Sequence, residues 1–327
     1  MSQLSSIPSS NPMANPATRS TSTGAIGILG MGAIGTLMAW HWRHRIEQKQ
    51  LFALQSSSLR QTAGQHAVMT RQFQPLDGPI TMLEVPLWPS IAADNSQPPE
   101  LDWLVVTTKA THTVDALEPW SDALSYIKRI LLLQNGMGQQ QEVEQWLESR
   151  QQGNTEIWLG ISTEGAFRPQ PDKVVYAGAG TTVIGPACNT TLPHILPDAM
   201  QPVTDIHQRQ REKLAINAVI NPLTGLLKCR NGELVSNPEY RIQLIQLAQE
   251  VKQFYESMGW PLSAPLTERA QQVAEATAQN RSSTLQDLLA GRPTELAYIC
   301  GYLLSLAASR DYPMPITERL YLTLNSV

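Results

Sequence analysis

Cysteine and histidine are scarce in this chain, and neither is grouped. The three cysteines, Cys188, Cys229 and Cys300, lie far apart, form no CxxC pair and are odd in number. The six histidines are scattered and form no HExxH motif. These spacings exclude a disulfide framework, favour a reducing compartment and argue against a metal site. We therefore expect a cytoplasmic protein that binds no metal ion.

Long hydrophobic runs and long basic runs are also lacking. No apolar stretch reaches the length of a membrane span. Residues 1–23 are rich in Ser, Asn, Pro and Thr, lack the apolar core of a signal peptide, and are expected to form a disordered tail. Net charge is −4 and the basic residues are dispersed, which argues against nucleic acid as a partner. The remaining chain has enough apolar material for two domains.

What the chain does have begins with a glycine-rich turn. It consists of Gly30, Met31, Gly32, Ala33, Ile34 and Gly35, between an apolar run at 25–29 and a helix-like segment at 36–40. The spacing is that of a dinucleotide-binding turn, in which the first glycine permits the bend and the second admits a pyrophosphate. The phosphates of such a ligand meet free N–H groups at a helix N-terminus. A strand-to-helix turn without a ligand is the alternative.

Apolar runs alternate with helix-like segments from residue 24 to residue 204. The runs lie at 50–54, 103–107, 130–133 and 157–160, and helices are expected at 113–124 and 139–148. This alternation predicts a parallel sheet with helices on its faces. Two further runs, at 174–176 and 181–184, flank an Ala-Gly-Ala-Gly stretch and are expected to form a β-hairpin.

Residues 205–327 have helical periodicity and no convincing strand. Helices are expected at 238–258, 267–279, 295–309 and 316–324, with Pro238 opening the first and Gly259 ending it. Ser283 and Gln286 are spaced as a capping box. The predicted fold is an N-terminal α/β Rossmann-type domain over 24–204, an all-α domain over 205–327, and a cleft between them.

The residues after the second strand favour NADP over NAD. An NAD site usually has a carboxylate there for the ribose hydroxyl. This chain instead continues with Gln55, three serines beginning at Ser56, and Arg60. Hydroxyl groups and an arginine suit a 2′-phosphate. The alternative is a simple polar turn.

Polar side chains at two places match the edge of a sheet where ligands bind. Lys109 follows the 103–107 run, and Asn135 follows the 130–133 run. Each alone could be an ordinary loop residue. Together at one sheet edge, they favour contacts near the nicotinamide end of a cofactor.

A third group lies on one helix. Lys213, Asn217 and Asn221 are spaced at i, i+4 and i+8 on an apolar segment, so they share one partly buried face. Pro222 is expected to kink or end this helix. A ketone reductase needs an acid for the forming alkoxide, and desolvation lowers a lysine pKa toward a useful range. Lys213 is thus the best candidate acid, whereas the local pattern around Glu295 suggests only a helix-dipole contact.

These segments together resemble the ketopantoate reductase (2-dehydropantoate 2-reductase) family. The resemblance is carried by GILGMGAIG, VVTTKA, LLLQNGMG, KLAINAVINPLTGLL, NGEL and RSSTLQDLLAGRPTE, in the family's order from residue 24 to about 310. The stretch 213–233 is the most specific. The implied activity is NADPH-dependent reduction of 2-dehydropantoate to (R)-pantoate, an oxidoreductase step toward pantothenate and coenzyme A.

The resemblance also implies residue roles. Residues Gly30 to Gly35 would form the NADP phosphate loop, with Lys109, Asn135 and Ala166 as further cofactor contacts. Lys213 would donate the proton, with Glu295 at the catalytic centre. Asn217, Asn221, Asn231 and Ser283 would bind the substrate. The family often has an arginine directly after the second strand, where this chain has Gln55, so Ser56 and Arg60 are the candidates for the 2′-phosphate.

Two other functions remain open from the sequence. The same fold could reduce another branched 2-oxo acid, because fold and cofactor do not fix the substrate. A non-catalytic NADP-binding sensor or partner protein is possible in principle, but Lys109, Asn135, Lys213 and Glu295 are all present. The chain is expected to be a monomer or a homodimer.

Overall fold

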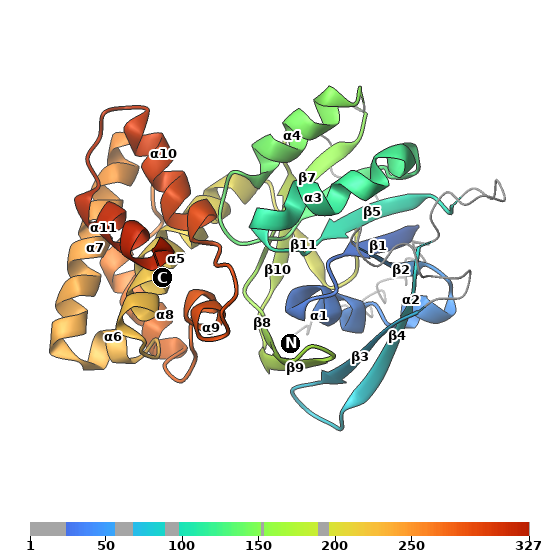
Figure 1. Ribbon diagram of the computed structural model, residues 1–327, viewed down its shortest axis with the longest axis horizontal. Coiled ribbons are helices and arrows are strands. Elements are labelled where there is room, and N and C mark those ends of the chain that lie inside the picture. Colours follow the sequence, from blue (N-terminus) through green and yellow to red (C-terminus); the bar gives the residue numbers. More distant parts are fainter. Residues whose placement is uncertain (1–23, 56–67, 89–97, 152–153, 189–195, 327) are drawn as a thin grey trace, which may run out of the picture.

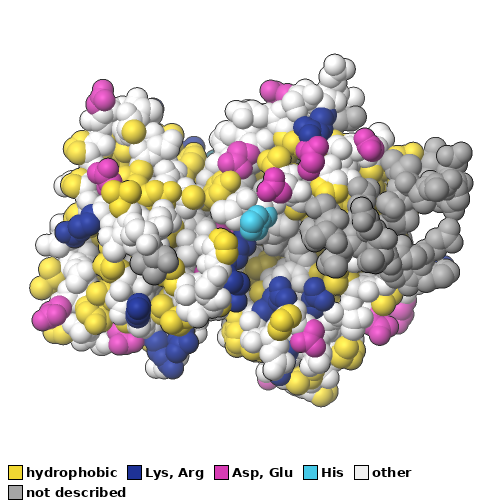
Figure 2. All heavy atoms as spheres, in the orientation of Figure 1, with side chains coloured by type: hydrophobic (Ala, Val, Ile, Leu, Met, Phe, Trp, Pro, Cys, Tyr) yellow, Lys and Arg dark blue, Asp and Glu magenta, His cyan; other side chains and the backbone are white. Residues whose placement is uncertain are grey.

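The computed structural model describes residues 24–55, 68–88, 98–151, 154–188 and 196–326. The expected tail at 1–23, together with Ser56 and Arg60, lies outside the described residues. The chain forms an α/β half and a helical half that lie side by side (Figure 1), and the space-filling view shows a groove between them (Figure 2). The fold class predicted from the sequence is confirmed.

A seven-stranded, mostly parallel sheet forms the centre of the α/β half. Its spatial order is β11 (Met200–Pro202), β10 (Thr182–Pro186), β7 (Glu156–Ser162), β6 (Arg129–Leu132), β5 (Leu101–Val106), β1 (Ala25–Leu29) and β2 (Leu51–Leu54). β10 runs antiparallel to β7, and the neighbours from β7 to β2 are parallel. The buried strands are near-continuous apolar runs, as expected when both faces are covered.

Short helices cover this sheet. They are α1 (Ala33–His41), α2 (His44–Glu47), α3 (Thr113–Leu117) and α4 (Gln139–Ser149), with 3₁₀ stretches at Ala110–His112 and Glu118–Tyr126. The helix expected at 113–124 thus changes type after Leu117, where Pro119 follows at the start of the 3₁₀ stretch. Two apolar cores form on opposite faces of the sheet.

A second sheet of four strands packs against α1. Its order is β4 (Thr81–Pro86), β3 (Val68–Gln74), β9 (Lys173–Gly178) and β8 (Gly165–Gln170). Trp40 of α1 stacks on Phe73 of β3 with ring centroids 4.8 Å apart. The predicted hairpin is wrong, because β9 pairs with β8 and β3 in this sheet whereas β10 pairs with β7 in the main one.

The helical half begins with a long helix, α5 (Ile206–Leu227), that runs along the groove. The others are α6 (Glu233–Ser236), α7 (Pro238–Ser257), α8 (Leu266–Ala276), α9 (Ser283–Leu289), a π-helical turn at Ala297–Gly301, α10 (Tyr302–Ala308) and α11 (Pro315–Asn325). Their apolar faces form one core. Among the described residues, no helix is long and apolar enough to cross a membrane.

The ends of three helices, α5, α7 and α9, test the sequence predictions. Pro238 opens α7 behind an Asn237 cap, and Gly259 follows its end with φ of 65°, as expected. Pro222 does not end α5, which continues to Leu227. The capping box is also wrong: Ser282 is the cap of α9, and its hydroxyl accepts a hydrogen bond from the N–H of Leu285.

Candidate active site

A large cavity is lined by residues of both halves. Its volume is about 1530 Å³, larger than the roughly 300–1,000 Å³ typical of one small ligand. Residues of the glycine turn, the carboxyl ends of β5 to β7, β8, α5 and α9 line it. The space suits an extended ligand together with a second small one.

The glycine turn forms one end of this cavity. Residues Gly30, Met31, Gly32, Ala33 and Ile34 line it, and Gly30 has φ of 103°. A Cβ on Gly32 would lie 4.0 Å from the Gly30 carbonyl oxygen and would meet no closer atom, so that position is open. Gly35 lies beneath the turn, where a Cβ would come within 2.2 Å of the Gly30 carbonyl oxygen. The turn therefore leaves its backbone accessible to a phosphate ligand.

Lys213 lies at the centre of the cavity wall. Its ammonium group donates hydrogen bonds to Asn135 Oδ1 and to the Ser162 carbonyl, both at 2.9 Å. α5 thus carries the lysine to the ends of β6 and β7. Burial lowers the pKa of Lys213 to about 8, while the nearby charge of Glu295 opposes that shift. A lysine with such a pKa can give and take a proton near neutral pH.

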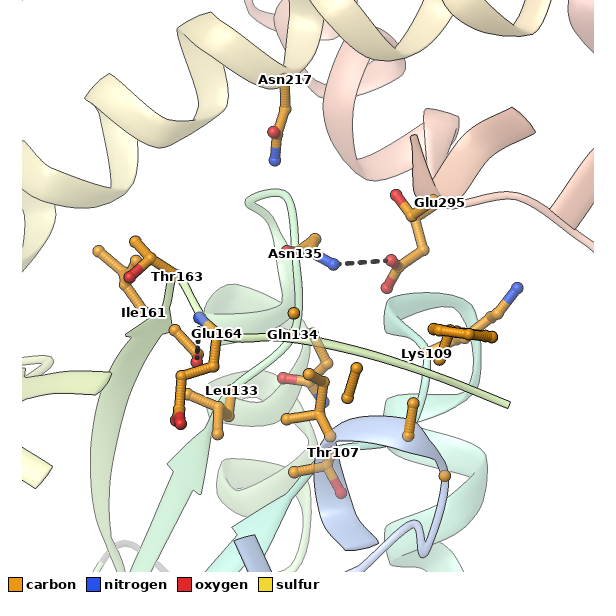
Figure 3. A pocket seen from close by; sticks show the side chains of 18 of the residues that line it. Thr107, Lys109, Leu133, Gln134, Asn135, Ile161, Thr163, Glu164, Asn217 and Glu295 are labelled. Atoms are coloured by element: carbon orange, nitrogen blue, oxygen red, sulfur yellow. Dashed lines mark hydrogen bonds between the residues drawn. The ribbon is translucent and has the colours of Figure 1, made fainter. Parts of the chain in front are cut away.

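Asn135 connects Lys213 to Glu295. Its amide nitrogen donates to Glu295 Oε2 at 3.2 Å, and the other carboxylate oxygen accepts from the Ala110 N–H at 3.1 Å. Glu295 is 8% exposed, and burial raises its pKa. The carboxylate comes from the helical half and both donors come from the α/β half, as Figure 3 shows for Asn135. The helix-dipole contact expected from the local pattern is not the main feature of Glu295, because both carboxylate oxygens accept hydrogen bonds from the α/β half.

Lys109 crosses the groove toward α9. Its ammonium lies 2.6 Å from Asp287 Oδ2 and donates to the Pro293 carbonyl at 2.6 Å. Asp287 also pairs with Arg292. The α/β half is thus tied to the helical half at one side of the cavity. The sequence did not point to Asp287 itself, although it lies within the family-like segment RSSTLQDLLAGRPTE.

Most of the other residues predicted to bind cofactor or substrate line the cavity. Asn217, Asn221, Ser283 and Ala166 line the cavity, and Asn217 points from α5 toward the loop that carries Asn135 (Figure 3). Asn231 does not line it: its amide donates to Thr277 Oγ1 at 2.9 Å, and Thr277 is the lining residue. A role for Asn231 as a direct ligand stays a prediction.

Several arginines that the sequence did not point to line the cavity, and two of them come from the second sheet. Arg71 of β3 and Arg168 of β8 come from the second sheet, beside the glycine turn. Neither lies in a motif, and the sheet itself was not predicted. No sequence signal marked them. In the described part of the chain, no group of three or more His, Cys, Asp or Glu side chains is arranged to hold a metal ion.

Comparisons with known proteins show which family this chain belongs to. The family model "Ketopantoate reductase PanE/ApbA" matches residues 26–189, and the model of the family's C-terminal part matches residues 205–327. The chain belongs to the ketopantoate reductase family. It is an oxidoreductase of this family by the same matches.

Curated relatives agree with this assignment. The 2-dehydropantoate 2-reductase of Yersinia pestis is 36% identical over 228 residues, covering 67% of this chain and 71% of the relative. The enzyme of Bacillus subtilis is 31% identical over 316 residues, covering 90% of this chain and 95% of the relative.

Solved structures show the same fold. The crystal structure of the probable 2-dehydropantoate 2-reductase of Bacillus subtilis has a TM-score of 0.67 at 27% identity, and the match covers 92% of this chain and 99% of that one. D-mandelate dehydrogenase, solved with NADH and anilino(oxo)acetate, has a TM-score of 0.71 at 17% identity, covering 92% and 97%. The latter shows the ketopantoate reductase fold in another dehydrogenase.

Proposed function

We propose that this ketopantoate reductase family member reduces 2-dehydropantoate to (R)-pantoate with NADPH, in a step toward pantothenate and coenzyme A. The observation that carries the proposal is the buried chain Lys213–Asn135–Glu295 in the same cavity as the glycine turn. It provides a poised proton donor where a nicotinamide ring and an oxo acid would meet. We place the reaction in the cytoplasm of the cell.

The cavity residues fit a bound dinucleotide. The open position at Gly32, where a Cβ would meet no atom closer than 4.0 Å, suits the close approach of its pyrophosphate to the backbone. When bound, a reduced nicotinamide supplies the hydride that adds to C2 of the oxo acid. Lys109 and Ala166 lie along the same cavity wall and are the further contacts we assign to the nucleotide.

Lys213 would supply the proton. As hydride adds to C2, the carbonyl oxygen becomes an alkoxide, and the Lys213 ammonium gives it a proton to form the hydroxyl. Asn135 Oδ1 and the Ser162 carbonyl hold the ammonium in place before transfer. Afterwards the neutral amine takes a proton from water, which the pKa of about 8 permits near neutral pH.

Glu295 would keep Lys213 charged despite its burial. Its carboxylate favours the ammonium form, and Asn135 and the Ala110 N–H hold that carboxylate. Asn217 and Asn221, on the same helix as Lys213, and Ser283 of α9 also line the cavity and are assigned to the carboxylate and hydroxyl of the substrate. Amide and hydroxyl groups can donate to these oxygens without adding charge.

The direct test follows the loss of reduced-nicotinamide absorbance with a panel of 2-oxo acids and with both NADPH and NADH. We expect kcat/KM to be highest for 2-dehydropantoate with NADPH. A higher value for another branched 2-oxo acid would change the substrate. Tight nucleotide binding without oxidation for any oxo acid would instead indicate a sensor protein.

Oligomeric state is a separate part of the proposal. We expect a monomer or a homodimer, and one structural neighbour, from Staphylococcus aureus, is described as a dimeric ketopantoate reductase. Light scattering at several protein concentrations measures the mass directly. A stable tetramer would contradict this expectation.

A further inference from the structure

Arg71 is fixed beside the glycine turn by the second sheet. It lies on β3, and its Nε donates a hydrogen bond to the Met31 carbonyl at 3.2 Å. Nη1 donates to the Thr70 carbonyl at 2.8 Å. The side chain is partly buried and lines the cavity. Its guanidinium therefore has a set position against the second residue of the turn.

A second guanidinium, that of Arg168, lies near the first, and neither one forms an ion pair within the described residues. Arg168 of β8 lines the same cavity; burial of Arg71 lowers the pKa of its guanidinium, and the charge of Arg168 lowers it further. Asp172 attracts Arg71 electrostatically but accepts a hydrogen bond from Gln72. Two neighbouring cations of this kind favour an anionic ligand.

Figure 2 is consistent with this placement. Lys and Arg side chains gather beside the groove between the two halves, on the side of the second sheet. The opposite rim of the α/β half carries more acidic side chains in this view. A negatively charged ligand entering the groove would therefore be drawn toward the second sheet.

The position of the pair corresponds to the adenosine end of a dinucleotide. In this fold the adenosine ribose lies at the carboxyl end of β2, and the pyrophosphate lies at the N-terminus of α1. β2 ends at Leu54, and the next residue, Gln55, is neutral and lines the cavity. β3 reaches this region because its partner β4 contacts β2 and its own face packs on α1.

We propose that Arg71, assisted by Arg168, binds the 2′-phosphate of NADPH and makes this ketopantoate reductase family member select NADPH over NADH. Selection of NADPH over NADH then depends on arginines of the second sheet, because Gln55, the residue after β2, has no charge. The inference rests on the proposed dinucleotide site but not on the identity of the oxo acid. Arg71 provides bidentate donors, since Nη2 has no protein partner among the described hydrogen bonds.

The test measures binding without catalysis. Calorimetric titration compares adenosine 2′,5′-bisphosphate with adenosine 5′-monophosphate, which differ only in the 2′-phosphate. In the natural sequence we expect the bisphosphate to bind more tightly. Arg71→Ala should weaken the bisphosphate by roughly tenfold to a hundredfold, the range for a charge-assisted hydrogen bond, and leave the monophosphate unchanged.

Three further variants complete the test. Arg168→Ala removes an exposed side chain, and we expect a several-fold loss for the bisphosphate alone. Arg310→Ala, an equal loss of charge at an exposed position outside the cavity, is the matched control and should change neither ligand. If Arg71→Ala does not fold, Arg71→Lys should retain the preference only in part.

Equal weakening of both adenosine ligands by Arg71→Ala would overturn the proposal, because the arginine would then serve the 5′-phosphate or the turn itself. So would no effect on either ligand. These outcomes are separate from a failure of the proposed reaction. If Arg71 confers tighter binding of the bisphosphate but the protein reduces no oxo acid, the 2′-phosphate subsite is supported and the proposed reaction is refuted. If the protein reduces 2-dehydropantoate equally well with NADPH and NADH, the proposed reaction is supported and the 2′-phosphate subsite is refuted.

Discussion

The pH dependence of turnover follows from the burial of Lys213. Burial lowers its pKa from 10.5 to about 8, which corresponds to an added cost of roughly 3 kcal/mol for the ammonium form. The proposed reaction needs that ammonium form. We therefore expect kcat/KM for the oxo acid to be constant below about pH 7 and to fall about tenfold per pH unit above about pH 8.

Substitution of Glu295 tests whether its charge raises the pKa of Lys213. Its charge raises the pKa of Lys213, so Glu295→Gln should lower that pKa and move the alkaline fall of kcat/KM to lower pH. Replacing the exposed Glu318 of α11 by Gln removes the same charge far from the cavity and should leave the profile unchanged. The assay is initial-rate nicotinamide absorbance from about pH 6 to about pH 10.

Two results would refute this reasoning. A wild-type profile that stays flat through about pH 9.5 would show that the titrating lysine is not the proton donor. An alkaline fall that Glu295→Gln leaves at the same pH would show that the two charges are not coupled. A loss of rate without a shift would assign Glu295 a role in orientation alone.

Three other predictions concern the framework around the site. Gly32→Ala should fold normally but bind dinucleotide poorly in calorimetry, because its Cβ would occupy open space that a pyrophosphate needs. Gly35→Ala should instead lower stability, because its Cβ would come within 2.2 Å of the Gly30 carbonyl oxygen. Gly136→Ala should cost roughly 1–3 kcal/mol and reduce kcat, since φ is 84° and a Cβ would lie 2.4 Å from the Tyr298 carbonyl oxygen, where the two halves meet. Glu250→Ala should cost about 3 kcal/mol in urea unfolding, because its buried carboxylate accepts three hydrogen bonds at the start of α11.

Controls for these variants are available within the chain. Gly178→Ala meets nothing within 4 Å and should be neutral in both stability and activity. Glu250→Gln retains one acceptor oxygen and should lose less than Glu250→Ala. Normal nucleotide affinity in Gly32→Ala would contradict the placement of the pyrophosphate, and unchanged stability in Gly136→Ala would contradict the close contact between the halves.

The main sheet and the helical half were predictable from local pattern. Strands such as β5 and β6 are buried on both faces and are therefore recognisable as apolar runs. The second sheet was missed because β3 and β8 are mostly partly buried or exposed and carry polar residues. Its parallel pairing of β3 with β9 joins segments about a hundred residues apart, and no local signal reveals such a partner.

The candidate site shows the same limit. The shared face of Lys213, Asn217 and Asn221 could be inferred from helical spacing alone. The contact of Lys213 with Asn135 joins residues from the two halves, and only the folded chain brings them together. Pro222 was expected to disturb α5 there, but the helix continues through it. Arg71 lies on a strand without any motif, so its position beside the glycine turn could not be foreseen.

The most direct test of the central claim is single-turnover reduction of 2-dehydropantoate by Lys213→Ala. With NADPH bound at saturation, we expect the rate of nicotinamide oxidation to fall by roughly 10²-fold or more, the scale of a lost general acid. Nucleotide affinity should stay unchanged, because Lys213 contacts Asn135 and the Ser162 carbonyl rather than the glycine turn. Oxidation at the wild-type rate in this variant would contradict the account.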